Sequence, residues 1–130
     1  MKHNEVIVEA VKSYTEAIVE AAKKHSVDAD IDVDFDDAYN AEENESATAA
    51  VITSKLGVVM VFPDFNKKGA CASIYNVGLA KWMIAEGFTE EQIEQEGRVF
   101  SQVLPYSKKN VEVFGYYLTH KIDYNKDRKR

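Results

Sequence analysis

The chain has 130 residues, of which 45% are apolar and 29% are charged, and its net charge is −6. This length and composition suit a single globular domain that folds without a metal or a disulfide. The only cysteine is Cys71, and the longest apolar run is far shorter than the ~18 residues of a membrane span. We therefore expect a soluble, cytoplasmic protein with no membrane partner, formed by one domain over residues 1–125 and a disordered basic tail over residues 126–130.

The first element predicted is an amphipathic helix over residues 4–25. Apolar residues recur there at three- and four-residue steps, namely Ile7, Val11, Tyr14 and Ile18. Asn4 suits the N-cap, and the basic residues near the end suit the negative pole of the helix dipole.

Four strands are predicted next, because apolar residues alternate or cluster between turn residues. The expected strands are 27–35, 47–53, 58–62 and 70–75, and residues 39–46 form a polar loop. Residues 54–57 read as a hairpin turn in which Gly57 takes a positive φ. Consecutive strands joined by short turns favour an antiparallel meander.

The second half of the chain predicts two helices and a last strand. Residues 77–86 and 89–104 have helical spacing and form a helical hairpin, with Gly87 ending the first helix. Residues 110–124 are interpreted as a strand whose shared face carries Phe114, Tyr116, Leu118 and Ile122. The fold class is therefore α+β, with an N-terminal helix, a four-strand antiparallel meander, a helical hairpin and a C-terminal strand.

The most unusual feature is a run of carboxylates without a base. Its members are Asp28, Asp30, Asp32, Asp34, Asp36, Asp37, Glu42, Glu43 and Glu45. The aspartates from 28 to 36 alternate with apolar residues, which places them on one face of a strand at intervals of ~6.8 Å. Such a row is either a solvated face that protects a sheet edge or a docking surface for a basic partner.

The leading functional hypothesis is a non-enzymatic protein-interaction module that binds a basic protein surface through these nine carboxylates. In one version it is an inhibitor that occludes a nucleic-acid-binding site by imitating DNA. One aspartate row is too dilute for this alone, because duplex DNA carries a charge every ~1.7 Å. The glutamates of residues 86–97 would have to share the surface. Direct binding of nucleic acid is not expected, since the acidic chain repels phosphate.

Several alternatives remain open. A small-molecule-binding domain or enzyme would have its pocket between the sheet and helices 77–104. Asp32, Asp34, Asp36 and Glu43 resemble a calcium loop, but Asp37 stands where the loop needs glycine, so weak divalent-cation binding at the row is the more plausible form. Residues 77–104 also have the outline of a helix-turn-helix, although glutamates would face the phosphates.

Nucleophilic catalysis would need Cys71 beside His25 or His120, and no local signature supports it. The three histidines have no metal-ligand spacing. We therefore assign no catalytic residue, metal or cofactor. A homodimer formed through an exposed sheet edge is a further possibility.

Overall fold

The computed structural model describes residues 2–75, 87, 89 and 103–120. Its elements are β1 (Lys2–His3), α1 (Glu5–His25), β2 (Asp32–Asn40), β3 (Glu45–Thr53), β4 (Val58–Asp64), β5 (Gly69–Tyr75), β6 (Leu104–Pro105) and α4 (Lys108–Thr119). The α+β class is confirmed. The expected helix over 77–86, the tail 126–130 and residues 90–102 of the expected helix over 89–104 lie outside the described residues. The last residue of that second helix is corrected, because Leu104 belongs to β6.

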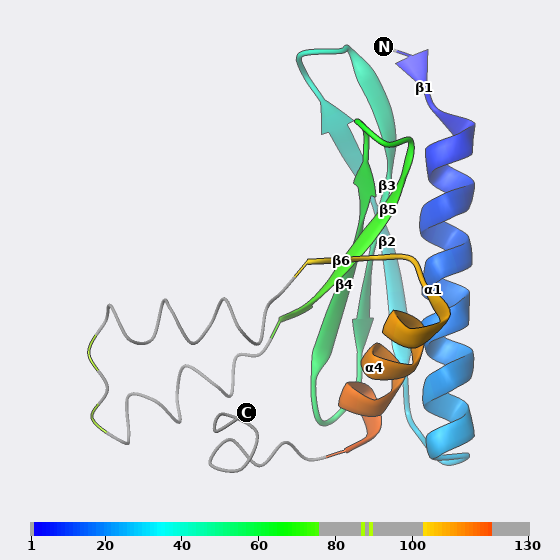
Figure 1. The fold of residues 1–130 in the computed structure, drawn as a ribbon, viewed down its shortest axis with the longest axis vertical. Coiled ribbons are helices and arrows are strands. Elements are labelled where there is room, and N and C mark those ends of the chain that lie inside the picture. Colours follow the sequence, from blue (N-terminus) through cyan, green and yellow to red (C-terminus); the bar gives the residue numbers. More distant parts are fainter. Residues whose placement is uncertain (1, 76–86, 88, 90–102, 121–130) are drawn as a thin grey trace.

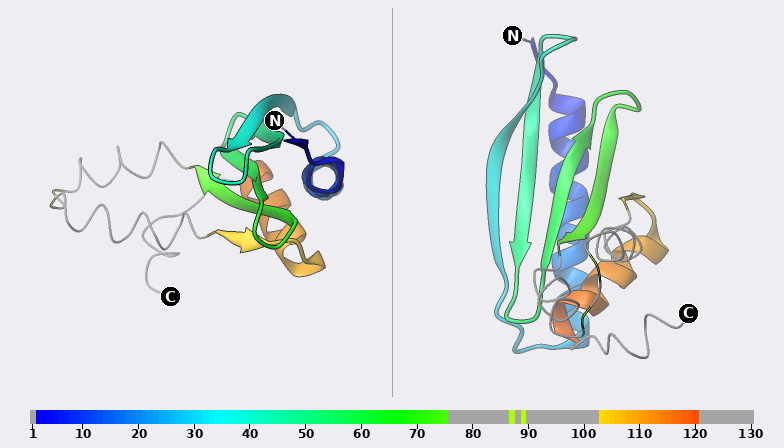
Figure 2. Two further views of the ribbon diagram at one scale, coloured as in Figure 1. Left: turned by 90° about the horizontal axis from the view of Figure 1, so that it is seen from above. Right: turned by 90° about the vertical axis from the view of Figure 1, so that its left-hand side faces the viewer.

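The sheet is a meander with one branch point (Figure 1). β2, β3, β4, β5 and β6 pair antiparallel in that order. β3 pairs with β4 only over its last four residues, from Ala50 to Thr53. On the same edge of β3, its first two residues pair instead with the short parallel strand β1. The β2–β3 and β4–β5 hairpins therefore separate toward their outer turns, as the right-hand view of Figure 2 shows.

Helix α1 begins where the capping chemistry predicted. The side chain of Asn4 accepts a hydrogen bond from the amide of Ile7 at 3.2 Å, which satisfies one of the free N–H groups of the first turn. The predicted apolar stripe is buried, and α1 packs across β3, β4 and β5. The hydroxyl of buried Tyr14 donates to the carbonyl oxygens of Leu104 and Pro105, at 3.2 and 3.1 Å, and so ties α1 to β6.

The predicted C-terminal strand over 110–124 is wrong, because residues 108–119 form helix α4. Ser107 caps this helix by accepting a hydrogen bond from the amide of Asn110 at 3.0 Å. Its buried residues are spaced by three and four, namely Val111, Phe114, Gly115 and Leu118. α4 packs against α1 in the same layer, so the two helices cover one face of the sheet (Figure 1).

Gly115 explains how closely the two helices approach. A Cβ atom built on Gly115 would lie 2.7 Å from the Ala21 Cβ and 2.9 Å from the Ala22 backbone nitrogen. No side chain fits at that distance, so this contact between helices selects glycine. The aromatic and β-branched residues of α4 favour a strand by intrinsic preference, and packing against α1 overrides that preference.

Two smaller expectations are also corrected. The strand expected over 27–35 is displaced toward the C-terminus, because β3 offers pairing partners from Thr53 to Glu45, opposite residues 32–40. The turn 54–57 does not use a positive φ at Gly57. Instead the hydroxyl of Ser54 accepts hydrogen bonds from the amides of Leu56 and Gly57, both at 3.2 Å. These bonds hold the turn without a left-handed residue.

Candidate functional site: the acidic edge strand

Three of the predicted aspartates form a row on β2. Asp32, Asp34 and Asp36 pair with Thr53, Val51 and Ala49 of β3. Paired residues of an antiparallel sheet share a face, and the intervening β3 residues, Ala50 and Ile52, are buried beneath the helices. The row therefore points away from α1 and α4. We call this side of the sheet the open face.

Among residues 2–75, 87, 89 and 103–120, no basic side chain forms an ion pair with the row. All three carboxylates are exposed. Within the described part of the chain the ion pairs are His3 with Glu5 and His25 with Glu112, and neither includes an aspartate of β2. The Oδ1 atom of Asp36 accepts a hydrogen bond from the backbone N–H of Asp37 at 2.9 Å, but in the described part of the chain no cation would have to be displaced from the three carboxylates.

The open face beside the row is apolar. Val51 is paired with Met60 of β4, and the side chain of Met60 is 38% exposed. Phe62 is partly buried on the same side of β4. An aspartate row next to an apolar strip differs from a uniformly solvated surface, since protein interfaces combine an apolar centre with a polar rim.

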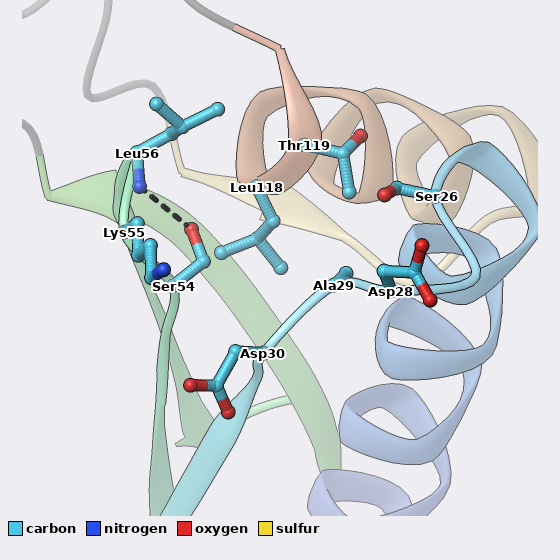
Figure 3. Close-up of a pocket in the computed structure, with 9 residues that line it drawn as sticks. All are labelled: Ser26, Asp28, Ala29, Asp30, Ser54, Lys55, Leu56, Leu118 and Thr119. Carbon is cyan, nitrogen blue, oxygen red and sulfur yellow. Dashed lines mark hydrogen bonds between the residues drawn. The ribbon is translucent and has the colours of Figure 1, made fainter.

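Asp28 and Asp30, which the sequence placed in the row, precede β2 and do not belong to it. They lie in the connection after α1 and line a hollow of about 270 Å³ at the end of the sheet. Figure 3 shows them across from the β3–β4 turn, where Lys55 lies, and from Leu118 and Thr119 of α4.

The remaining four predicted carboxylates are also divided. Asp37 lies on the opposite side of β2 from the row, next to Tyr39, whose hydroxyl donates to it at 3.4 Å. Glu42 and Glu43 occupy the turn between β2 and β3. Glu45 accepts a hydrogen bond from the Asn4 side chain at 2.9 Å, which gives it a structural role at the start of β3. The structure thus brings together three of the nine residues, and all but two of residues 86–97 lie outside its description.

The calcium-loop reading is not compatible with this geometry. Asp32, Asp34 and Asp36 lie on an extended strand, so their side chains are spaced along it and do not converge on one ion. Within the described ranges, no three histidine, cysteine or acidic side chains gather at a distance suited to a metal ion.

Cys71 does not meet a histidine. Its thiol donates to the Asp64 carboxylate at 3.8 Å, beside a hollow of about 450 Å³ between the tips of the two hairpins. Burial raises the pKa of this thiol, and the charge and hydrogen bond of Asp64 raise it further. A thiol held in its protonated form is a weak nucleophile.

A cluster of aromatic and histidine rings at the C-terminal ends of α1 and α4 was not predicted from the sequence. His120 stacks on Tyr116 with ring centroids 3.9 Å apart, and His25 lies edge-on to His120 at 5.5 Å. His25 also approaches Glu112 at 3.5 Å. The one available signal was the four-residue spacing of Tyr116 and His120, which is a helical neighbour relation.

No family model, curated protein or solved structure matches the chain. Among the described helices, none is both long and apolar enough to cross a membrane.

Proposed function

We propose that the protein is a non-enzymatic interaction module that binds a basic protein surface through the row Asp32, Asp34 and Asp36. The observation that carries this proposal is the exposure of three carboxylates on one face of β2, without an ion pair among the described residues and beside the apolar residues Val51 and Met60. Its free thiol suits a reducing compartment, so the proposal places it in the cytoplasm.

The geometry favours a protein partner over any direct contact with nucleic acid. The row repels phosphate and attracts lysine and arginine, and the adjoining apolar strip offers contact area that a simple counter-ion cannot use. Each adjacent pair of aspartates repels by only ~0.6 kcal/mol in water at ~6.8 Å, so the folded domain tolerates the row while it is solvated.

The inhibitory version of the proposal concerns what the basic partner does. Proteins that bind nucleic acid carry basic patches, and a module that covers such a patch would block it. The row alone has a much lower charge density than duplex DNA, at one carboxylate per ~6.8 Å against one charge per ~1.7 Å. Occlusion of the site is therefore better supported than faithful imitation of DNA.

The test compares three immobilised proteins. The first is the wild type, the second is D32N/D34N/D36N, and the third is the matched control E9Q/E16Q/E20Q, which removes three exposed carboxylates from α1. Both variants have a net charge of −3, from −6 + 3. Basic proteins captured from a lysate and identified by mass spectrometry should bind the wild type and the control but not the β2 variant. Thermal denaturation checks that all three are folded.

Equal capture by all three proteins would overturn the assignment of the β2 face. The inhibitory version has its own readout, because duplex DNA added in excess should release a partner that is bound through its nucleic-acid site. A partner that stays bound in the presence of DNA contradicts that version and leaves the interaction surface standing.

A further inference from the structure

The outer edge of β2 is unpaired among the described strands. All nine residues of β2 pair with β3 in one continuous register without a bulge, and no other described strand pairs with β2. The right-hand view of Figure 2 shows β2 at the margin of the sheet. Alternate residues of such an edge turn their N–H and C=O groups outward, where another chain can pair with them. The N–H of Asp37 donates to the Asp36 carboxylate at 2.9 Å, so this one group is already occupied. An exposed sheet edge is the usual receptor for strand addition.

The helix side of the same edge exposes aromatic surface. Val33 and Phe35 alternate with the aspartates and so lie on the side of the sheet that faces the helices. α1 packs over β3, β4 and β5, and leaves the side chains of Phe35 and Tyr39 50% and 61% exposed. A chain added beside β2 would meet three carboxylates on one of its faces, and on the other the side chains of Phe35 and Tyr39 with Asp37 between them.

We infer that the β2 edge receives an extended basic segment of the partner, in which lysine or arginine alternates with apolar residues. This inference rests on the proposed function and states how the partner binds. Side chains directly opposite on neighbouring strands have Cβ atoms ~4.5–5.5 Å apart, so bases at alternate positions can lie beside Asp32, Asp34 and Asp36. The apolar residues between them then cover Val33 and Phe35.

A second copy of this chain fits the same edge poorly. Antiparallel pairing of two β2 strands about Asp34 would place that residue opposite its own copy, with Asp32 opposite Asp36. Like charges directly opposite each other are destabilising, and in a parallel pairing the two rows would still lie side by side. The charge pattern therefore selects a basic strand and disfavours self-pairing.

The probe is a fluorescent eight-residue peptide, Thr-Lys-Val-Lys-Val-Lys-Val-Thr, and binding is followed by fluorescence anisotropy. The control peptide has the same composition with its three lysines contiguous, so that they cannot share one face of a strand. Two further peptides are N-methylated on the backbone. One carries the methyl groups on its lysines, and the other carries them on its inner valines. N-methylation removes the N–H donor and keeps the charge, and alternate residues of a strand point their N–H groups in opposite directions.

If the peptide binds by strand addition, one of the two N-methylated peptides should lose binding and the other should keep it. The D32N/D34N/D36N variant should bind the alternating peptide at least about threefold more weakly, from three opposite-charge pairs, while E9Q/E16Q/E20Q should bind it normally. Hydrogen exchange of the β2 amides should slow on binding in the wild type.

Each contrary outcome has a separate meaning. If both N-methylated peptides bind like the parent, or if the contiguous-lysine peptide binds equally well, strand addition is wrong and the acidic surface of the proposed function stands. If the β2 variant binds every peptide as well as the wild type does, the proposed function fails too. A wild type that binds none of the peptides overturns the inference.

Discussion

The contact between α1 and α4 at Gly115 gives the sharpest test of the fold. The change is Gly115→Ala, whose new Cβ would lie 2.7 Å from the Ala21 Cβ and 2.9 Å from the Ala22 backbone nitrogen. Overpacking of this kind costs about 1–3 kcal/mol. Because two of the three contacted atoms are backbone (the Ala22 nitrogen and the Ala21 carbonyl carbon), and backbone moves less readily than a side chain, we take the upper half of that range. Alanine also has a better helix propensity than glycine by about 1 kcal/mol.

The expected net effect is a loss of about 1–2 kcal/mol in the free energy of unfolding, measured by urea denaturation. The control is Gly69→Ala in β5, where a Cβ meets no atom within 4 Å, and it should change stability by less than about 0.5 kcal/mol. Adding Ala21→Gly to Gly115→Ala removes the nearest contact. The double variant should therefore lose less free energy of unfolding than the two single variants lose when their losses are added. If the Gly115→Ala variant proves as stable as the wild type, this packing of α4 on α1 is refuted.

Further predictions concern the buried Tyr14 and the partly buried thiol of Cys71. Tyr14→Phe removes the hydrogen bonds to the carbonyl oxygens of Leu104 and Pro105, so urea denaturation should show a loss of about 1–2 kcal/mol, and an unchanged midpoint would contradict this role. The raised pKa of Cys71 means that the folded state holds the thiol proton more tightly than the unfolded state does, so stability should fall as the pH rises above the ordinary thiol pKa of 9.0. Cys71→Ser should reduce this alkaline loss, and Asp64→Asn should speed alkylation of Cys71 by iodoacetamide; an equal alkylation rate would argue against the Asp64 contact.

The parts of the fold that could be predicted from sequence are those fixed by local signals. α1 carries a cap at Asn4 and a regular apolar stripe, and both are seen in the structure. The central strands alternate or cluster apolar residues between turns, so their existence was predictable. The end of β3 at Thr53, the start of β4 at Val58 and the end of β5 at Tyr75 lie where the sequence predicted them. The bounds of β2 were not predictable, because its pairing with β3 sets where it begins and ends.

α4 could not be recognised in the same way. Its sequence offers Val111, Phe114 and Tyr116 at positions that fit either a strand or a helix, and the intrinsic preference of these residues favours the strand. The deciding fact is that Gly115 lies against Ala21 and Ala22, which are more than 90 residues earlier in the chain. A local pattern carries no record of such a contact.

The acidic site was predictable in its middle and not at its ends. Alternation correctly placed Asp32, Asp34 and Asp36 on one face. Asp28 was assigned to the row because it continued the alternation, but the strand begins only at Asp32. Asp37 follows Asp36 directly, so a continuous strand must turn it to the other side.

The same charges lead to a prediction about self-association. If Asp32, Asp34 and Asp36 keep the β2 edge from pairing with its own copy, then D32N/D34N/D36N should associate where the wild type does not. Asparagine keeps the size and polarity of the side chain, and the edge keeps its unpaired backbone groups and its exposed Phe35. Multi-angle light scattering over a concentration series should therefore give this variant a higher mass than the wild type at equal concentration. E9Q/E16Q/E20Q has the same net charge and should keep the wild-type mass, which separates a local effect at β2 from a general loss of charge repulsion. Identical masses for all three proteins would mean that the aspartates do not protect this edge, and the selection of a basic strand over a second copy would then need another cause.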